Sequence, residues 1–125
     1  MEKRKENRVE PGGAVPAGSR LRLAFGPFAR ARGLLGCEGF DGMLMIAPCR
    51  DVHTAGMASP IDVAFVDARG MVVESHRRVG PFRRLRNRRA VCVIERISRC
   101  ESPWFKQGER VTLSEVRGTD EERSR

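Results

Sequence analysis

One stretch near the middle of the chain constrains the fold more than any other. Residues 61–66 read IDVAFV, an apolar and β-branched run that follows Pro60, and residues 71–76 read MVVESH. Between them lies Asp-Ala-Arg-Gly, in which the Asp carboxylate can accept hydrogen bonds from the local backbone and Gly70 can adopt a positive φ. We therefore predict an antiparallel β-hairpin, with residues 61–66 as a central strand and residues 71–76 as its partner.

Two carboxylates fall within strands that otherwise read as buried. In the 61–66 strand, side chains alternate between two apolar faces, and Asp62 is the one charged residue. In a second predicted strand, residues 90–97, Glu95 follows Val93 on the same face. A carboxylate in such surroundings is poorly solvated, so we expect hydrogen-bond donors close to Asp62.

The rest of the ordered chain is predicted as short strands with one helix. Alternating Leu and Arg residues indicate a half-buried strand that begins at residue 21, and Gly26-Pro27 ends it. Apolar residues at helical spacing then predict a short helix near residues 27–36. The remaining elements are strands at residues 42–47, packed beside the hairpin, at 90–97 and at 111–113, and a capped helical turn at 102–105.

The length of 125 residues fits one domain with a single core. We predict a mainly-β, compact β-sandwich or jelly-roll-like domain over residues 21–113. Residues 1–20 lack any periodicity and are expected to be a disordered basic arm, and residues 114–125 a charged flexible tail. No apolar run is long enough for a membrane span or a signal core, so we expect a cytoplasmic monomer.

The four cysteines do not form any Cys-x-x-Cys pair. In the cytosol such residues are expected to be thiols that act as small apolar side chains. Cys49 and His53 are one possible ligand pair, with Cys37 or His76 as further candidates, but paired close spacings typical of zinc sites are missing. We therefore predict neither a metal nor a cofactor.

Most of the formal charge of +8 comes from one segment. Residues 77–89 contain seven arginines and no acidic residue. Such a segment can bind phosphates of a nucleic acid, or an acidic protein. It can equally be a solvated edge that discourages strand-to-strand aggregation, and Phe82 is its only aromatic residue. The arginines are Arg77, Arg78, Arg83, Arg84, Arg86, Arg88 and Arg89.

The order of several short motifs resembles DUF192, a family of small, uncharacterised bacterial and archaeal proteins. The most specific motif is His-Thr-x-x-Met-x-x-Pro-Ile-Asp-Val-x-Phe-x-Asp-x-x-Gly at residues 53–70, and the resemblance covers roughly residues 21–113. It implies a compact mainly-β domain, sandwich or jelly-roll-like, without an established activity or cofactor. The other motifs are RARGLL at residues 30–35, GML at 42–44, VIE at 93–95 and GE at 108–109.

Three hypotheses for function follow. The first is a binding module, rather than an enzyme, for a small ligand or a protein, with a pocket formed by His53, Thr54, Asp62 and Glu95. The second is an anion-binding protein that uses the arginines of residues 77–89, with nucleic acid possible but not favoured. The third is a hydrolase or isomerase in which His53 and Asp62 act as acid and base. Against the third, a buried carboxylate often only accepts structural hydrogen bonds.

Overall fold

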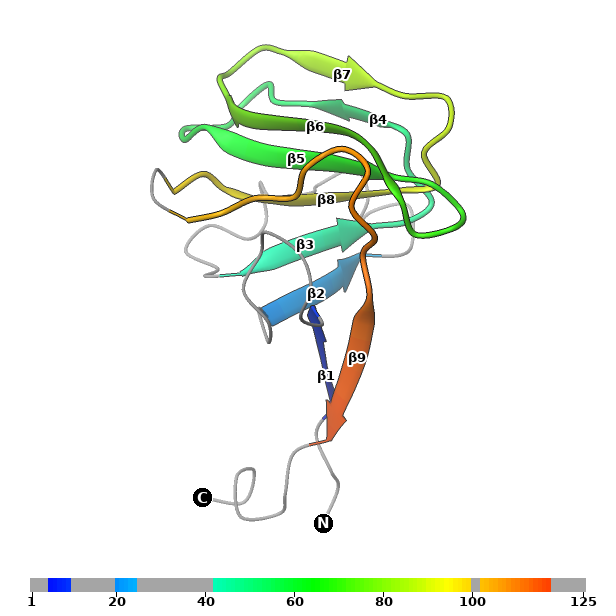
Figure 1. The fold of residues 1–125 in the computed structure, drawn as a ribbon. Coiled ribbons are helices and arrows are strands. Elements are labelled where there is room, and N and C mark those ends of the chain that lie inside the picture. The colour runs from blue at the N-terminus through cyan, green and yellow to red at the C-terminus, as the bar shows by residue number, and fades with distance from the viewer. Residues whose placement is uncertain (1–4, 10–19, 25–41, 100–101, 118–125) are drawn as a thin grey trace, which may run out of the picture.

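The computed structural model describes residues 5–9, 20–24, 42–99 and 102–117 (Figure 1). These residues form nine strands and no helix, and therefore no helix that could cross a membrane. The predicted mainly-β class is confirmed, whereas the helix predicted near residues 27–36 lies outside the described residues. The strands are β1 (Lys5–Val9), β2 (Arg20–Ala24), β3 (Met43–Ile46), β4 (Asp51–His53), β5 (Ile61–Val66), β6 (Val72–Val79), β7 (Arg84–Arg86), β8 (Cys92–Ile97) and β9 (Leu113–Arg117).

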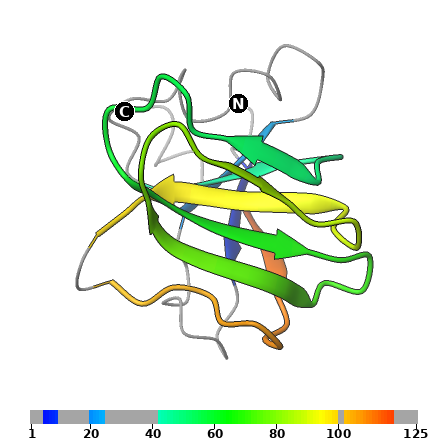
Figure 2. The same cartoon turned by 90° about the horizontal axis from the view of Figure 1, so that it is seen from above.

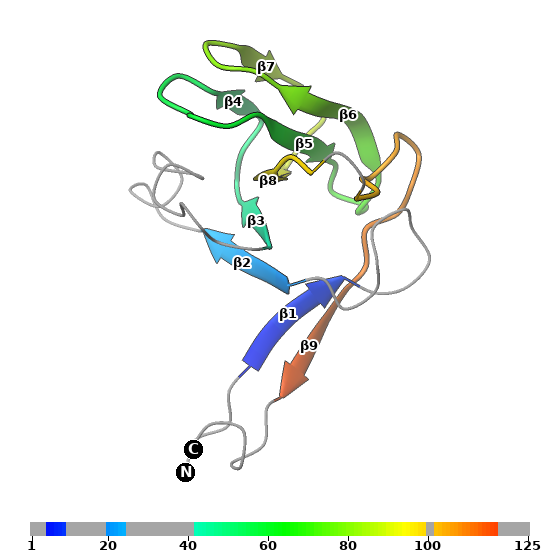
Figure 3. The same cartoon turned by 90° about the vertical axis from the view of Figure 1, so that its left-hand side faces the viewer.

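The strands form two layers. Seven of them make one sheet in the order β6-β5-β8-β3-β2-β1-β9, in which only β2 and β3 are parallel, and β4 pairs with β7 in a separate two-stranded layer above it (Figures 1 and 2). At the other end, β1 and β9 lead away from the two layers (Figure 3). The prediction that residues 42–47 pack beside the hairpin is wrong, because β8 lies between β3 and β5. Strand β8 is buried on both faces, as a central position requires.

The predicted hairpin is confirmed as β5 and β6. The Asp67 carboxylate accepts the backbone N–H groups of Arg69 and Met71, each at 2.9 Å, and Gly70 has a φ of 84°. Strand β6 continues past the predicted end to Val79, with two register irregularities against β5. Asp67 and Gly70 therefore have the roles in the turn that the sequence predicts, as hydrogen-bond acceptor and as positive-φ residue.

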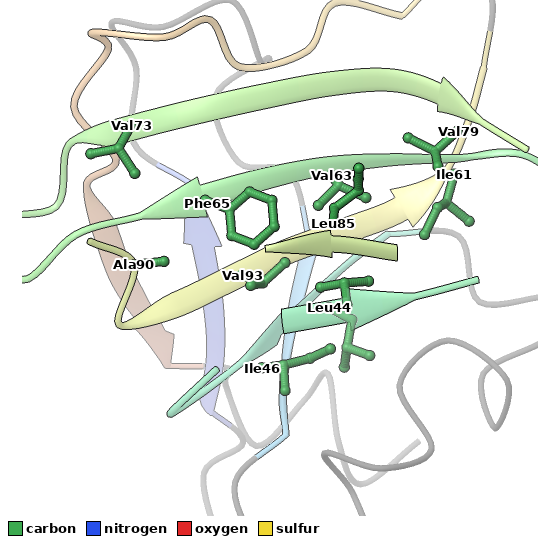
Figure 4. Close-up of a cluster of buried hydrophobic side chains, with 11 residues drawn as sticks. Leu44, Ile46, Ile61, Val63, Phe65, Val73, Val79, Leu85, Ala90 and Val93 are labelled. Carbon is green, nitrogen blue, oxygen red and sulfur yellow. The ribbon is translucent and has the colours of Figure 1, made fainter. Parts of the chain in front are cut away.

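Each face of the large sheet carries its own apolar cluster. The first cluster lies between the two layers, where Phe65, Val63 and Val93 are fully buried and Leu85 of β7 packs against them (Figure 4). The second cluster lies on the opposite face, where Ile94 is fully buried together with other apolar residues of β3, β5 and β8. The sheet thus separates two environments, which decides where its polar side chains can meet.

Residues 102–112, here called the strap, cover the second cluster. Trp104 and Phe105 are 3% exposed, and the Trp104 indole N–H donates to the Val63 carbonyl at 3.3 Å. The helical turn predicted at residues 102–105 is wrong: residues 103–106 adopt no regular secondary structure, and the Ser102 and Phe105 carbonyls accept hydrogen bonds from side chains of the sheet. Strand β9 begins at residue 113, later than predicted, and β1 falls within residues 1–20.

Candidate functional site

Asp62 is fully buried in β5 and sits under the strap. Its Oδ2 accepts a hydrogen bond from Arg96 Nε at 2.9 Å, and its Oδ1 accepts the backbone N–H of Arg78 at 3.0 Å. Arg96 is itself buried and stacks on Trp104, with its guanidinium carbon 4.6 Å from the ring centroid. The donors expected around Asp62 are present, and both carboxylate oxygens are occupied.

Thr54 joins the end of β4 to the turn between β6 and β7. Its hydroxyl, 1% exposed, donates to the Gly80 carbonyl at 2.6 Å and accepts the Arg83 N–H at 2.9 Å. Its backbone N–H donates to the Arg83 carbonyl at 2.9 Å. Both hydrogen-bonding roles of the hydroxyl are therefore used inside the protein.

His53 lies on the outer surface of the two-stranded layer. It is exposed and pairs with Arg84 across the β4–β7 ladder, while the neighbouring Val52 points inward. On the same surface, Asp51 accepts hydrogen bonds from the Arg84 guanidinium at 3.0 and 2.5 Å, and this contact lowers the pKa of the Asp51 carboxyl. His53 thus belongs to a charged outer surface.

Glu95 lies between the two layers. It pairs with Leu44 on one side and Val63 on the other, and it shares its face of β8 with the buried Val93. The side chain is 3% exposed, and no hydrogen bond reaches its carboxyl within the described part of the chain. Burial raises the pKa of Glu95 to about 7. Glu95 can therefore gain or lose a proton near neutral pH.

These four residues do not meet in one pocket. In the β5–β8 register, Asp62 pairs with Arg96 and Val63 pairs with Glu95, so the two carboxylates point to opposite faces of the sheet. His53 is on the outer surface of the other layer. The sheet therefore also separates His53 from Asp62.

Six of the seven exposed arginines in residues 77–89, one near the end of β6 and five on β7 or beside it in the sequence, are here called the arginine surface. Arg77 is different, because its Nη2 donates to the carbonyls of Arg99 at 3.0 Å and Ser102 at 2.7 Å, which turns it toward the strap. Asp51 is the one acid within 4 Å of these six side chains in the described residues. They are Arg78, Arg83, Arg84, Arg86, Arg88 and Arg89.

Phe82 projects from the turn at one end of this surface. It is 82% exposed, and its φ of 59° places the backbone in the left-handed region. Arg78, just before the turn, has a φ of 55°. Positive φ values are unusual for residues other than glycine, and a bulky aromatic residue in that conformation is a marked outlier.

A polar group on β6 was not among the predicted site residues. Glu74 Oε2 lies 2.5 Å from His76 Nε2, and Asn87 donates to Glu74 Oε1 at 2.7 Å. Partial burial opposes ionisation of Glu74, but these two hydrogen bonds outweigh it and lower the pKa of the carboxyl. The i, i+2 spacing of Glu74 and His76 on one strand was the available signal.

The described cysteines act as packing residues. Cys92 is buried and Cys49 half-buried, and the Cys49 thiol donates to the Asp51 carbonyl at 3.3 Å. Burial, together with nearby Cys49, raises the pKa of the Cys92 thiol to about 11, which disfavours the thiolate. Within the described residues, no three side chains suited to a metal lie close enough to share an ion.

Two stacked β layers, a strap packed on the outer face of the larger sheet and a cationic surface on the smaller layer define a mainly-β domain with surface-exposed candidate sites. The chain belongs to the DUF192 family, described as "Uncharacterized ACR", whose profile matches residues 8–113. Comparison with curated proteins gave no match.

Two solved structures share the fold. A protein of unknown function from Novosphingobium aromaticivorans is 17% identical, with a TM-score of 0.66 over 86% of this chain and 83% of that one. A "putative transcription regulator" from Sinorhizobium meliloti is 19% identical, with a TM-score of 0.65 over 90% of this chain and 96% of that one. At these identities the likeness establishes the fold alone.

Proposed function

We propose that the protein is a binding module whose arginine surface takes a single-stranded nucleic acid. The observation that carries this proposal is Phe82, an 82% exposed aromatic ring held in left-handed backbone beside arginines. A turn needing that backbone is less strained with glycine or asparagine, so phenylalanine costs free energy without any packing in return. An exposed ring among cations is what base stacking requires.

The arginines have an arrangement that suits a phosphate backbone. Arg84 and Arg86 point to the same side of β7, about 7 Å apart at their Cα atoms. Arg83 and Arg88 flank β7 in the sequence, and both are exposed. Because Asp51 neutralises part of the charge of Arg84 and Arg86, the flanking arginines are expected to supply most of the attraction. A row of cations along an extended strand can follow one nucleic-acid strand.

The other two hypotheses have weaker support. A pocket of His53, Thr54, Asp62 and Glu95 requires side chains that lie in separate places, and an acid–base pair of His53 and Asp62 requires two groups that the sheet separates. The name of the Sinorhizobium meliloti neighbour, which refers to transcription, is compatible with a nucleic-acid ligand.

The test is fluorescence anisotropy with a labelled oligothymidylate about 15 nucleotides long, repeated between about 50 and 200 mM salt. Replacing Arg83, Arg84, Arg88 and Arg89 by Ala is expected to reduce the slope of log affinity against log salt by roughly 3, at about 0.7 for each lost phosphate contact. Phe82→Ala is expected to weaken oligothymidylate binding about tenfold and to leave polyphosphate binding unchanged, because polyphosphate has no bases to stack.

A matched pair of single variants separates this surface from general charge effects. Arg83→Ala and Arg110→Ala each remove one exposed cation, but Arg110 lies on the strap, so only Arg83→Ala is expected to weaken binding. An unchanged salt slope in the four-arginine variant contradicts the proposal. If oligoglutamate binds as tightly as oligothymidylate and Phe82→Ala affects neither, the ligand is an acidic protein and not a nucleic acid.

A further inference from the structure

A groove of about 440 Å³ lies between β6 and the strap, on the side of the sheet away from the arginine surface. Its volume is within the range of small-molecule sites, roughly 300–1,000 Å³. Pro103, Trp104 and Phe105 supply its apolar wall, and Arg77 and Lys106 supply two cations. None of the described residues that line the groove is acidic.

The strap wall of the groove is held in place by hydrogen bonds to the sheet. Ser75 Oγ donates to the Phe105 carbonyl at 2.6 Å, and Arg77 and Arg96 both donate to the Ser102 carbonyl, at 2.7 and 3.0 Å. The indole N–H of Trp104 adds a bond to the sheet backbone. A wall fixed in this way loses little conformational freedom when a ligand binds.

The two cations retain donors for a ligand. Arg77 is 39% exposed, and its Nη2 makes the two carbonyl contacts and lies 3.7 Å from Asp62 Oδ2, so guanidinium N–H groups on its other nitrogens remain. Nearby Asp62 is already neutralised by Arg96 at 2.9 Å. At the other cation, Glu109 accepts the backbone N–H of Lys106 and holds its position, while the Lys106 side chain is exposed.

From this arrangement we propose that the groove binds a small organic anion, namely a carboxylate carried on a flat apolar body. The carboxylate lies between Arg77 and Lys106, and the apolar body packs against Pro103 and the edges of the two aromatic rings. This site is independent of the arginine surface, because it lies on the opposite side of the sheet and shares none of its residues.

Trp104 is the single tryptophan of the chain and lines the groove, so its fluorescence is expected to respond to a ligand bound there. The probes are benzoate, its neutral isostere benzamide and inorganic phosphate, titrated at constant ionic strength. Benzoate is expected to change the fluorescence saturably, with benzamide and phosphate each binding at least about tenfold more weakly, since each lacks one of the two recognised features. The amide chemical shifts of Lys106 and Gln107 are expected to change with benzoate concentration in the same saturable way as the fluorescence.

Two variants of equal charge provide the control. Lys106→Gln is expected to weaken benzoate binding about tenfold, which is the loss of about 1.4 kcal/mol, whereas Arg110→Gln, outside the groove, is expected to leave it unchanged. Gln107→Glu, which adds a carboxylate to the lining, is expected to abolish it. The proposal is overturned if benzamide binds as well as benzoate, if benzoate does not saturate, or if Lys106→Gln has no effect.

Discussion

The substitution Glu95→Gln should stabilise the protein relative to the wild type, and this gain in stability should be larger at alkaline pH than at acidic pH. Glu95 is 3% exposed between Leu44 and Val63, and burial raises its pKa to about 7 from an ordinary 4.5. The unfolded chain therefore loses this proton at lower pH than the folded protein does. Gln has nearly the same shape and no charge at any pH, so it removes this difference.

The sign and size of this pH-dependent change in stability follow from the pKa values of Glu95 in the folded and unfolded protein. A folded-state pKa above the unfolded value contributes stability that is fully present below pH 4.5 and is lost as the pH rises through about 7. At about 1.4 kcal/mol per pH unit, the wild type loses about 2–3 kcal/mol between pH 5 and pH 8 from this group. The free energy of unfolding of Glu95→Gln, minus that of the wild type, should rise by the same amount.

The assay is equilibrium urea unfolding of both proteins at pH 5 and pH 8, followed by the fluorescence of Trp104, which is buried in the fold. Glu74→Gln is the matched control with the opposite sign. Hydrogen bonds from His76 and Asn87 outweigh partial burial and lower the pKa of Glu74, so its contribution is present at neutral pH and lost on acidification. An unfolding free-energy difference for Glu95→Gln that is the same at both pH values refutes the reasoning.

Two further sets of substitutions test the buried ion pair and the backbone conformation of the glycines. Asp62→Asn leaves the buried Arg96 without its counter-charge and should lower the unfolding free energy by about 3–5 kcal/mol, and the double variant Asp62→Leu/Arg96→Met should recover most of that loss in urea unfolding. Gly70→Ala should cost about 1–3 kcal/mol in the same assay, because its φ is 84° and its new Cβ meets a carbonyl oxygen at 3.2 Å. Gly108→Ala, with a φ of 93° and no such contact, should cost less, and Gly80→Ala close to nothing; equal costs at all three sites would contradict this reasoning.

Structural features that depend only on residues close together in the sequence were predictable. The β5–β6 hairpin follows from two apolar runs joined by Asp-Ala-Arg-Gly, and Asp67 and Gly70 fill the expected roles. The alternation along β8 likewise places Glu95 beside Val93 on a buried face. These signals are local because a strand's side-chain period and a turn's backbone requirements involve only a few consecutive residues.

The composition of the candidate sites was not predictable in the same way. Alternation shows that Asp62 and Glu95 are both buried, but it does not show which faces of the sheet they share. Residues 102–105 were predicted as a helical turn because these residues allow one, yet their carbonyls accept hydrogen bonds from distant side chains of the sheet and no helical turn forms. In the same way, Arg77 belongs by sequence to the arginine cluster and by contacts to the strap.

By itself, the sequence determined a mainly-β chain, its central hairpin and turn, and the burial of two carboxylates, since hydrophobic periodicity and turn chemistry act over short distances. The tertiary structure alone decided that Asp62 pairs with Arg96, 34 residues away, and that Glu95 lies on the opposite face with no partner in the described residues. It also decided that the strap and β6 enclose a groove. The physical reason is strand register: a shift of one residue between β5 and β8 exchanges the faces of every side chain, and register is set by the packing of both layers together.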